Sequence, residues 1–304
     1  MKTTKYFLSL LFSAVLLVTT ASAQNNPGED STGLPGDNFD LQGALQLFQN
    51  AASPENFEKA INTEGNHINN LDLDGDGDID YVRVIGKMEK EVHVFVLQVA
   101  VSATENQDIA VIELEKTGNE TAVIQIVGDE DIYGEQVIVE PDGGGNDGSF
   151  YSINNSNLSG PNVNYDMNIS GIVVNVWLWP SVKFVYTPFY KLWHSPWKWN
   201  YYPAWWKPWR PFGWSVWHPF RSNYHKSFVV VHTHRVVNAH RIYTPFRSSS
   251  VVVRNRHSAS VNNFRVTRSK TSVTGPRGNK TTVKKTTVTG PRGNKATKVK
   301  VRRH

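Results

Sequence analysis

The 304-residue chain contains no cysteine. Disulfide bonds, thiolate metal ligands, cysteine nucleophiles and a lipid anchor on an N-terminal cysteine are therefore all excluded. A chain without disulfide bonds must be stabilised by core packing or by a bound metal ion.

Acidic residues are absent from the second half of the chain. All 27 Asp and Glu residues lie at or before Asp166, and residues 24–166 contain only five Lys and Arg, a balance of −22. Residues 167–304 contain 25 Lys and Arg and no acid. The overall charge of +5 therefore conceals two segments of opposite charge, which must neutralise each other or face different partners.

Long apolar runs are also missing, apart from one near the N-terminus. Tyr6–Val18 is apolar, and it is preceded by Lys2 and Lys5 and followed by an Ala-Ser-Ala motif. This pattern is typical of a secretory signal peptide over residues 1–23, and its apolar core is too short for an ordinary transmembrane helix. We therefore expect an exported protein of the periplasm, outer envelope or extracellular space, with no transmembrane span.

Motifs that identify common enzyme classes are absent as well. The chain has no Gly-x-Ser-x-Gly, no His-Glu-x-x-His and no phosphate-binding Gly-Lys-Ser/Thr. Carboxylates are frequent in the first half, but no pair of them marks an apolar pocket that would raise a pKa for acid catalysis. We expect a protein without enzymatic activity. A hydrolase site assembled from scattered residues is the alternative.

Residues 39–141 predict an acidic α+β domain. Phe39–Ala51 has apolar residues at helical spacing, and Ser53 and Pro54 supply an N-cap and a first-turn proline for a second helix ending near Ile61. Five Val- and Ile-rich runs with short connections follow, which favours an antiparallel sheet covered by the two helices. The runs are Tyr81–Ile85, Val92–Val101, Ile109–Glu115, Thr121–Val127 and Gln136–Val139.

The third run has the alternation of a half-buried strand. Ala110, Ile112 and Leu114 share one face, and Glu113 and Glu115 share the other. This pattern places the first face in the core and the two glutamates on a polar face.

Composition divides the rest of the chain. We expect Gly-, Asn-, Ser- and Pro-rich linkers at 24–38 and 142–171, a Trp/Pro-rich β or irregular region at 172–247, and a basic low-complexity tail at 248–304. The tail contains two copies of a 15-residue repeat, TSVTGPRGNKTTVKK at 271–285 and TTVTGPRGNKATKVK at 286–300. Each copy predicts a hairpin around its Gly-Pro-Arg-Gly-Asn turn, although the scarcity of large apolar residues is equally consistent with disorder.

The Trp/Pro-rich region holds all ten tryptophans, between Trp177 and Trp217. Because proline opposes helix interiors and central strands, Tyr186–Phe220 should form loops, turns and polyproline-like segments, flanked by strands at Ile172–Trp179 and Phe228–Val237. The rings could form a core, a platform for glycans or a membrane interface, or a stacking surface for single-stranded nucleic acid. Ten tryptophans in so short a segment are too many to leave exposed, and export argues against nucleic acid.

The sharpest local motif is LDLDGDGDIDYVRV, which begins at Leu71. A hard cation such as Ca²⁺ takes six to eight oxygen ligands, and alternate aspartates around a glycine turn provide them. The aspartates are Asp72, Asp74, Asp76, Asp78 and Asp80.

This segment resembles the DxDxDGxxD calcium loop of EF-hands, dockerins and FG-GAP repeats. An EF-hand has a bidentate Glu at loop position 12, where this chain has Arg83, and a strand follows instead of a helix, so the β-context form is the closer likeness. The resemblance implies a weak Ca²⁺ site, with a dissociation constant of about 10⁻⁴–10⁻³ M. Its side-chain ligands would be Asp72, Asp74, Asp76 and Asp80, with Asp78 binding through its carbonyl. The alternative is a solvated acidic turn, but five neighbouring aspartates would repel one another without a cation.

Eight of the ten histidines lie after residue 193. His232 and His234 are expected on one face of a strand with His240 nearby, and two imidazoles at that spacing can ligate zinc or copper. Since no acid in this half could complete such a site, the sequence favours polar histidines on a basic, aromatic surface.

Four features together resemble exported proteins of Gram-negative, Bacteroidota-type bacteria: the signal peptide, NNLDLDGDGDIDYVRV, GDEDIYGEQVIVEP and the WLWP…SPWKW…YPAWW series. The resemblance implies residence in the cell envelope and no particular activity. We expect a calcium-stabilised acidic domain joined to a basic, aromatic region that binds anionic envelope material such as lipopolysaccharide, acidic polysaccharide or lipid head groups. The rival hypothesis is a self-contained structural protein whose basic tail docks on its own acidic domain.

Overall fold

The computed structural model describes residues 31–143, 173–221, 224, 226–263, 265–274, 280–289 and 295–303. The signal peptide expected at 1–23, residues 24–30 of the first expected linker and residues 144–171 of the second lie outside these residues. The rest of the first linker, expected to be a spacer, is packed on the protein: Leu34 and Asp37 are buried, and residues 35–38 form a 3₁₀ helix. The described strands form a six-stranded sheet in the order β1-β2-β3-β4-β5-β6 and a three-stranded sheet in the order β7-β8-β9.

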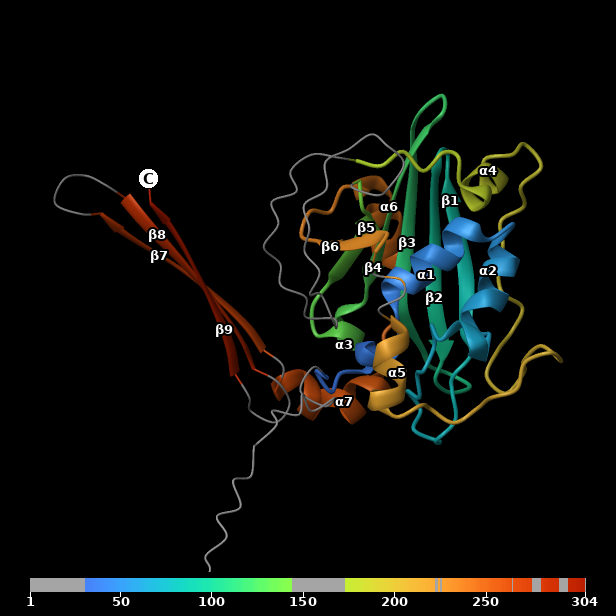
Figure 1. The fold of residues 1–304 in the computed structure, drawn as a ribbon. Helices are drawn as coiled ribbons and strands as arrows, with labels where there is room; N and C mark the ends of the chain where they lie inside the picture. The colour runs from blue at the N-terminus through green and yellow to red at the C-terminus, as the bar shows by residue number, and fades with distance from the viewer. Residues whose placement is uncertain are drawn as a thin grey trace, which may run out of the picture.

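The six-stranded sheet is antiparallel throughout (Figure 1). Its strands are β1 (Val82–Glu89), β2 (Val92–Ala100), β3 (Asn106–Gly118), β4 (Thr121–Gly128), β5 (Val137–Pro141) and β6 (Phe228–Val231). The first five match the five runs predicted from the sequence, so the antiparallel α+β prediction is confirmed. The sixth comes from the basic half and pairs with β5.

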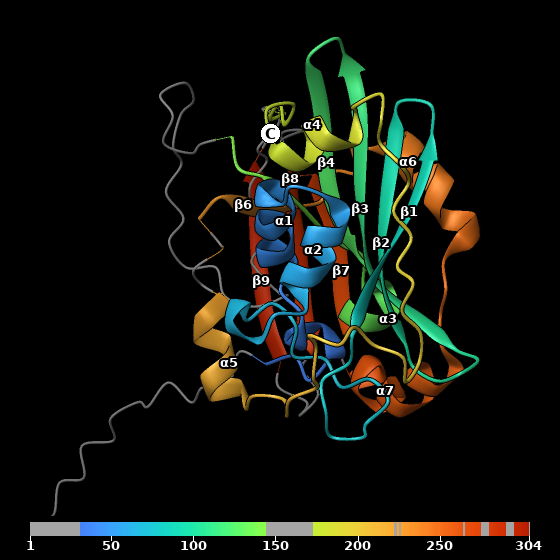
Figure 2. The same ribbon diagram turned by 90° about the vertical axis from the view of Figure 1, so that its right-hand side faces the viewer.

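Two predicted helices and one further helix cover the first face of this sheet (Figures 1 and 2). They are α1 (Leu41–Asn50), α2 (Pro54–Ile61) and α4 (Pro180–Val185). The side chains of Asp40 and Ser53 accept hydrogen bonds from the first-turn N–H groups of α1 and α2, as N-caps do. Phe48 of α1 packs against Phe57 and Phe95 with ring centroids 5.3 and 5.2 Å apart, in the centre of the main core.

The second face of the sheet is covered by α6 (Val237–Tyr243), which leads into the short 3₁₀ turn η3 (Thr244–Phe246) (Figure 2). Val94, Val96 and Val111 of the sheet pack there with Ala239 and Tyr243 of the helix. The central strands are therefore buried on both sides.

The remaining helices lie near the ends of the strands (Figure 1). They are η1 (Pro35–Asn38), η2 (Glu64–Asn66), α3 (Glu130–Tyr133), α5 (Trp214–Arg221) and α7 (Val251–Asn263). Helix α7 falls within the stretch expected to be a low-complexity tail, where Ser250 accepts from the N–H of Val253 as an N-cap.

Local predictions for the aromatic region were wrong at three places. The described part of the strand expected at Ile172–Trp179 is a loop that leads into α4, and β6 ends at Val231 instead of Val237. Helix α5 forms despite Pro219 in its interior. The stretch between α4 and α5 has the loops and turns that its prolines predict.

The edge strand β1 is covered by a piece of this irregular stretch. Gly86 N–H donates to the Trp193 carbonyl at 2.8 Å, and Ser195 N–H donates to the Val84 carbonyl at 3.1 Å. An added Cβ on Gly86 would come within 2.5 Å of the Trp193 carbonyl oxygen, so this close approach requires a glycine.

The C-terminal repeats form the three-stranded antiparallel sheet. Its strands are β7 (Arg265–Thr274), β8 (Lys280–Thr289) and β9 (Lys295–Arg303). The two Gly-Pro-Arg-Gly-Asn turns lie outside the described residues, but the strands on either side of each turn pair as the hairpin prediction requires. Among the described helices, none has the length and apolar character needed to cross a lipid bilayer.

Candidate functional site

Two groups of side chains bring metal-ligating atoms together among the described residues. The first, which we term the aspartate cluster, consists of Asp72, Asp74 and Asp80; the second, the Glu–His cluster, consists of Glu113, His234 and His240. Within each group, one ligand atom from every side chain lies within 4.8 Å of the others. Either group could hold a metal ion.

The aspartate cluster lies in the loop that leads into β1. The N–H groups of Gly75 and Gly77 donate to the Asp72 carboxylate at 2.7 and 3.1 Å. Both glycines have positive φ (71° and 91°), a conformation that other residues rarely adopt, and this lets the loop curl around Asp72. The N–H of Leu73 donates to Asp80 Oδ2 at 2.5 Å and closes the loop.

Carboxylate charge is concentrated in this loop. Burial raises the pKa of Asp80 well above its usual range, and the charges of Asp74 and Asp72 raise it further. Burial also raises the pKa of Asp74. Among the described residues, Arg256 of α7 donates from Nη1 to the Leu73 carbonyl at 2.8 Å, and its charge lowers the pKa of Asp74. A bound cation would stabilise the ionised carboxylates far more directly.

Three of the five predicted calcium ligands meet in this cluster. Asp76 and Asp78 belong to the same loop but not to the cluster, and Asp76 accepts from the N–H of Asp78 at 2.9 Å. Arg83, at loop position 12, lies on β1 and donates to Gln98 and to Asn106. A cleft of about 210 Å³ adjoins the loop, and Asp72 is among its lining residues.

The Glu–His cluster joins the acidic half of the chain to the basic half. Glu113 on β3 is fully buried, and each of its oxygens contacts one imidazole. Oε2 contacts Nε2 of His234, and Oε1 lies 2.8 Å from Nδ1 of His240. The two rings pack edge to face with centroids 4.3 Å apart. The hydrogen bond to Glu113 raises the pKa of His240, although burial acts in the opposite direction.

The sequence analysis assumed that no acid could complete a site with these histidines, and this assumption was wrong. Glu113 does lie on the face of β3 opposite Ile112, but α6 covers that face, so the carboxylate is buried. Strand β6 ends before His232, and the partner of His234 is His240. A signal was present in β2, whose sequence VHVFVLQVA is almost continuously apolar, as in strands buried on both faces.

Gln125 on β4 fixes the segment that carries His234. Its Nε2 donates to the Thr233 carbonyl at 2.9 Å, and its Oε1 accepts from the N–H of Arg235 at 2.7 Å and of Val236 at 3.3 Å. Gln125 is the cross-strand partner of Glu113. These three hydrogen bonds therefore position His234 next to the Glu113 carboxylate.

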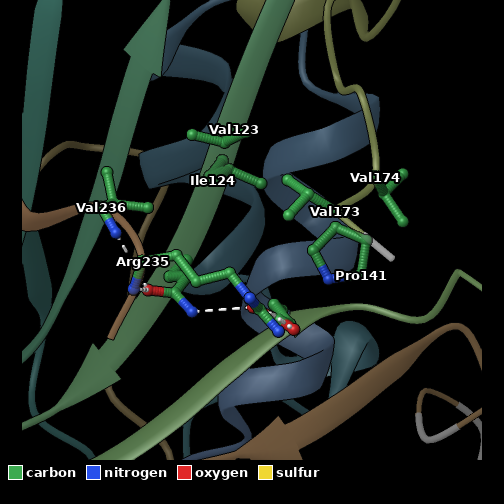
Figure 3. Close-up of a pocket in the computed structure, with 9 residues that line it drawn as sticks. Val123, Ile124, Pro141, Val173, Val174, Arg235 and Val236 are labelled. Carbon is green, nitrogen blue, oxygen red and sulfur yellow. Dashed lines mark hydrogen bonds and ion pairs between the residues drawn. The ribbon is translucent and has the colours of Figure 1, made fainter. Parts of the chain in front are cut away.

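An ion pair strengthens the same junction (Figure 3). Arg235 Nε lies 3.1 Å from Glu140 Oε2 on β5, and Gln125 Nε2 donates to the same oxygen at 2.7 Å. The hollow next to Arg235 measures about 10 Å³, which is room for about one water molecule. It offers no site for a larger ligand.

Helix α6 is fixed by the other glutamate of β3. Glu115 Oε1 accepts from the N–H of Ala239 at 2.8 Å, and Oε2 accepts from Asn238 Nδ2 at 3.1 Å. Ala239 and Tyr243 are buried against the sheet. These contacts fix the first turn of α6 and thereby position His240.

A second set of ion pairs connects the two halves near α3. Arg247 Nε lies 2.5 Å from Asp129 Oδ2, and its Nη2 lies 2.9 Å from Asp131 Oδ2. The hydrogen bond to Asp129 raises the pKa of the Arg247 guanidinium above its usual value. Part of the positive charge of residues 173–263 therefore neutralises acids of the first half.

The tryptophans are distributed over the body of the protein, and most of their rings are covered. Trp179, Trp206 and Trp217 are buried, and Trp205, which is 45% exposed, is the most exposed of the ten. Trp193 Nε1 donates to Glu58 Oε2 at 3.0 Å, beneath the irregular stretch that covers β1. This distribution agrees with the core interpretation, although the rings extend the main core instead of forming one of their own.

The two clusters differ in the metal chemistry that they favour. The aspartate cluster offers only oxygen, which suits hard cations, whereas the Glu–His cluster offers two imidazole nitrogens and one carboxylate, which suit first-row transition metals. No family model, no curated protein and no solved structure matches this chain.

Proposed function

We propose that this chain is a non-enzymatic protein of the bacterial cell envelope. Its folded body, formed by the described residues of 31–143 and 173–263, holds Ca²⁺ at the aspartate cluster, and its C-terminal sheet β7-β8-β9 binds anionic envelope material. The ligand class consists of phosphate- or carboxylate-bearing molecules such as lipopolysaccharide, acidic polysaccharide or lipid head groups.

The observation that carries this proposal is the register of the C-terminal sheet. Lys270 pairs with Lys284, and Lys284 pairs with Lys300, so three lysines occupy one row across the three strands. Like charges at directly opposite positions destabilise a sheet. Residues 264–304 contain 13 Lys and Arg and no acid, so a bound polyanion is the natural source of compensation.

The ion pairs of the folded body indicate that the two parts of the basic half have different partners. Arg235 and Arg247 already neutralise carboxylates of β5 and α3. The rival hypothesis, in which the basic tail docks on the chain's own acidic domain, draws support from Arg256, whose guanidinium reaches the aspartate loop. The carboxylates already paired with Arg235 and Arg247 are less available to the C-terminal sheet, which favours an external partner.

Neutralising the lysine row should weaken binding to anionic surfaces. Each Lys near an anionic membrane contributes about 1 kcal/mol, so the triple variant K270Q/K284Q/K300Q should bind phosphatidylglycerol vesicles or lipopolysaccharide about 100-fold more weakly at low salt. Co-sedimentation of the full mature chain measures this. The matched control K183Q/K191Q/K198Q removes the same charge from exposed positions of the folded body and should change binding much less.

Two outcomes would contradict the proposal. One is wild-type binding that is equal for anionic and zwitterionic vesicles and absent for lipopolysaccharide at low salt. The other is an equal loss of binding in the two triple variants, which would mean that net charge alone is responsible. Competition from the acids of the chain's own body would instead appear in the ionic-strength dependence of binding. Salt screens such contacts, because it shortens the range of exposed charges to about 8 Å at 0.15 M.

The assignment of Ca²⁺ to the aspartate cluster rests on its ligands and its loop. All three side chains are carboxylates, two glycines shape the turn, and the sequence resembles the β-context calcium loop. Extracellular modules of this kind bind Ca²⁺ with dissociation constants of about 10⁻⁴–10⁻³ M.

Calcium should raise the thermal stability of the mature protein. At 10 mM Ca²⁺ and such affinities, the stabilisation is about 1–3 kcal/mol relative to the chelated protein. Asp72→Asn should abolish this difference, whereas the control Asp78→Asn should keep most of it, because the calcium-loop pattern uses only the backbone carbonyl of residue 78. A melting temperature of the wild-type protein that does not change between Ca²⁺ and chelator would remove calcium from the proposal.

A further inference from the structure

We propose that Glu113, His234 and His240 bind one divalent transition-metal ion of the zinc class. This site lies on the α6 side of the six-stranded sheet. It is chemically distinct from the aspartate cluster, and it does not depend on the function proposed above.

The three side chains present a set of donor atoms that matches such an ion. One Glu113 carboxylate oxygen, His234 Nε2 and His240 Nδ1 converge within 4.8 Å of one another. Zinc binds imidazole nitrogen and carboxylate oxygen at about 2.0–2.2 Å, which places its ligand atoms about 3.3 Å apart in a tetrahedral site. Small side-chain rotations would therefore admit the ion between atoms that now contact one another.

The burial of Glu113 also favours a bound cation. The carboxylate is fully buried, and among the described residues its salt-bridge partners are two histidines, which are charged only when protonated. The neighbouring permanent cation, Arg235, is directed to Glu140. A buried carboxylate without a permanent counter-charge is costly, and a divalent ion bound by two neutral imidazoles supplies that charge.

The ligands are held by a second layer of contacts, as in known metal sites. Gln125 fixes the backbone on both sides of His234 through Thr233 and Arg235. Glu115 fixes the first turn of the helix that carries His240. Because these clamps come from β3 and β4, the same strands position the carboxylate and both imidazoles.

Solvent can reach the site from the histidine side. The His234 and His240 side chains are 21% and 28% exposed, whereas the Glu113 side chain is 0% exposed. Three protein ligands with an exposed side leave a fourth position for water or for an exogenous ligand, as in open zinc sites.

Metal titration of the full mature chain tests this proposal. The Asp72→Asn variant, in which the aspartate cluster is disrupted, should still bind one equivalent of Zn²⁺, or of Co²⁺ as a spectroscopic substitute. Loss of second-layer contacts weakens metal sites by about 10–100-fold, so Glu113→Gln and His240→Ala should weaken this equivalent by more than about 100-fold. The control His194→Ala removes an exposed histidine at the β1 edge and should leave the affinity unchanged.

A measurement on the wild-type protein keeps the proposal testable if a variant fails to fold. Addition of Zn²⁺ should shift the ¹⁵N resonances of His234 Nε2 and His240 Nδ1 and leave those of His194 in place. Wild-type protein that binds no Zn²⁺ at micromolar concentrations would overturn the proposal and leave the cluster as a carboxylate–imidazole ion pair. Equal affinity in the wild type and His240→Ala would also overturn it.

Discussion

Replacement of Glu58 by Ala is expected to lower the free energy of unfolding by about 3–5 kcal/mol. The Glu58 carboxylate lies at the junction of α2, β1 and the irregular stretch, and it is 2% exposed. Four donors converge on its two oxygens: Tyr81 Oη at 2.9 Å, Val84 N at 2.9 Å, Trp193 Nε1 at 3.0 Å and Ser195 Oγ at 2.9 Å. Alanine would leave all four without an acceptor in a buried site.

Replacement by Gln should cost far less, about 1 kcal/mol. Oε1 serves the two hydroxyl groups of Tyr81 and Ser195, while Oε2 serves the two N–H groups of Val84 and Trp193. A hydroxyl can accept as well as donate, so a Gln amide could donate to both hydroxyls while its carbonyl keeps both N–H donors. The substitution also removes a carboxylate whose pKa is raised by burial.

Urea denaturation of the mature protein measures both effects. Glu55→Ala is the matched control, because Glu55 lies in the first turn of the same helix and is exposed. It should cost a few tenths of a kcal/mol through the helix dipole. Equal midpoints for Glu58→Ala and Glu55→Ala would show that the carboxylate does not join the two parts of the chain.

Strands β1–β5 and helices α1 and α2 could be predicted from the sequence because their signals are local. Ser53 and Pro54 mark the start of α2, and the five apolar runs are separated by short turns that leave an antiparallel arrangement as the simplest solution. The aspartate cluster was also recognisable, since its carboxylates lie within nine residues. In each case, residues that are close in sequence carry the whole signal.

The Glu–His cluster could not be predicted in this way. Glu113 and His234 are separated by 121 positions, and nothing in the local pattern of either residue identifies the other. The strongest sequence feature, the change of charge sign at Asp166, suggested that a carboxylate could not reach the histidines. The fold removes that obstacle, because β6 and α6 of the basic half pack directly on the sheet of the acidic half.

Helix α5 illustrates how tertiary contacts override local preference. Proline in a helix interior costs about 3 kcal/mol, and Pro219 therefore argued against a helix. In the structure, Trp217 Nε1 and Arg221 Nη1 both donate to the carbonyl of Asp37, at 2.9 and 3.2 Å. Packing against the body supplies most of the stability of a short helix, which is information that a local pattern does not contain.

Replacement of Trp217 by Ala is expected to lower the free energy of unfolding by about 3–5 kcal/mol, the usual loss for a large aromatic side chain in a core. Trp217 is fully buried. Its indole holds α5 against η1, where Asp37 also accepts from Thr32 and from the N–H of Gly33. Removing the ring would create a cavity and release one of the two hydrogen bonds that, among the described residues, join α5 to the carbonyl of Asp37.

Trp205→Ala is the control, because Trp205 belongs to the same tryptophan-rich stretch but is 45% exposed. Its ring is approached by Lys59 at 5.4 Å, and a cation–π contact at such an exposed site contributes about 0.5–1 kcal/mol. Denaturation midpoints of the two variants then separate two uses of tryptophan. A large loss at Trp217 with a small one at Trp205 means that the aromatic region stabilises the body. Equal small losses would mean that this region is peripheral, and the tryptophans would again be candidates for a binding surface.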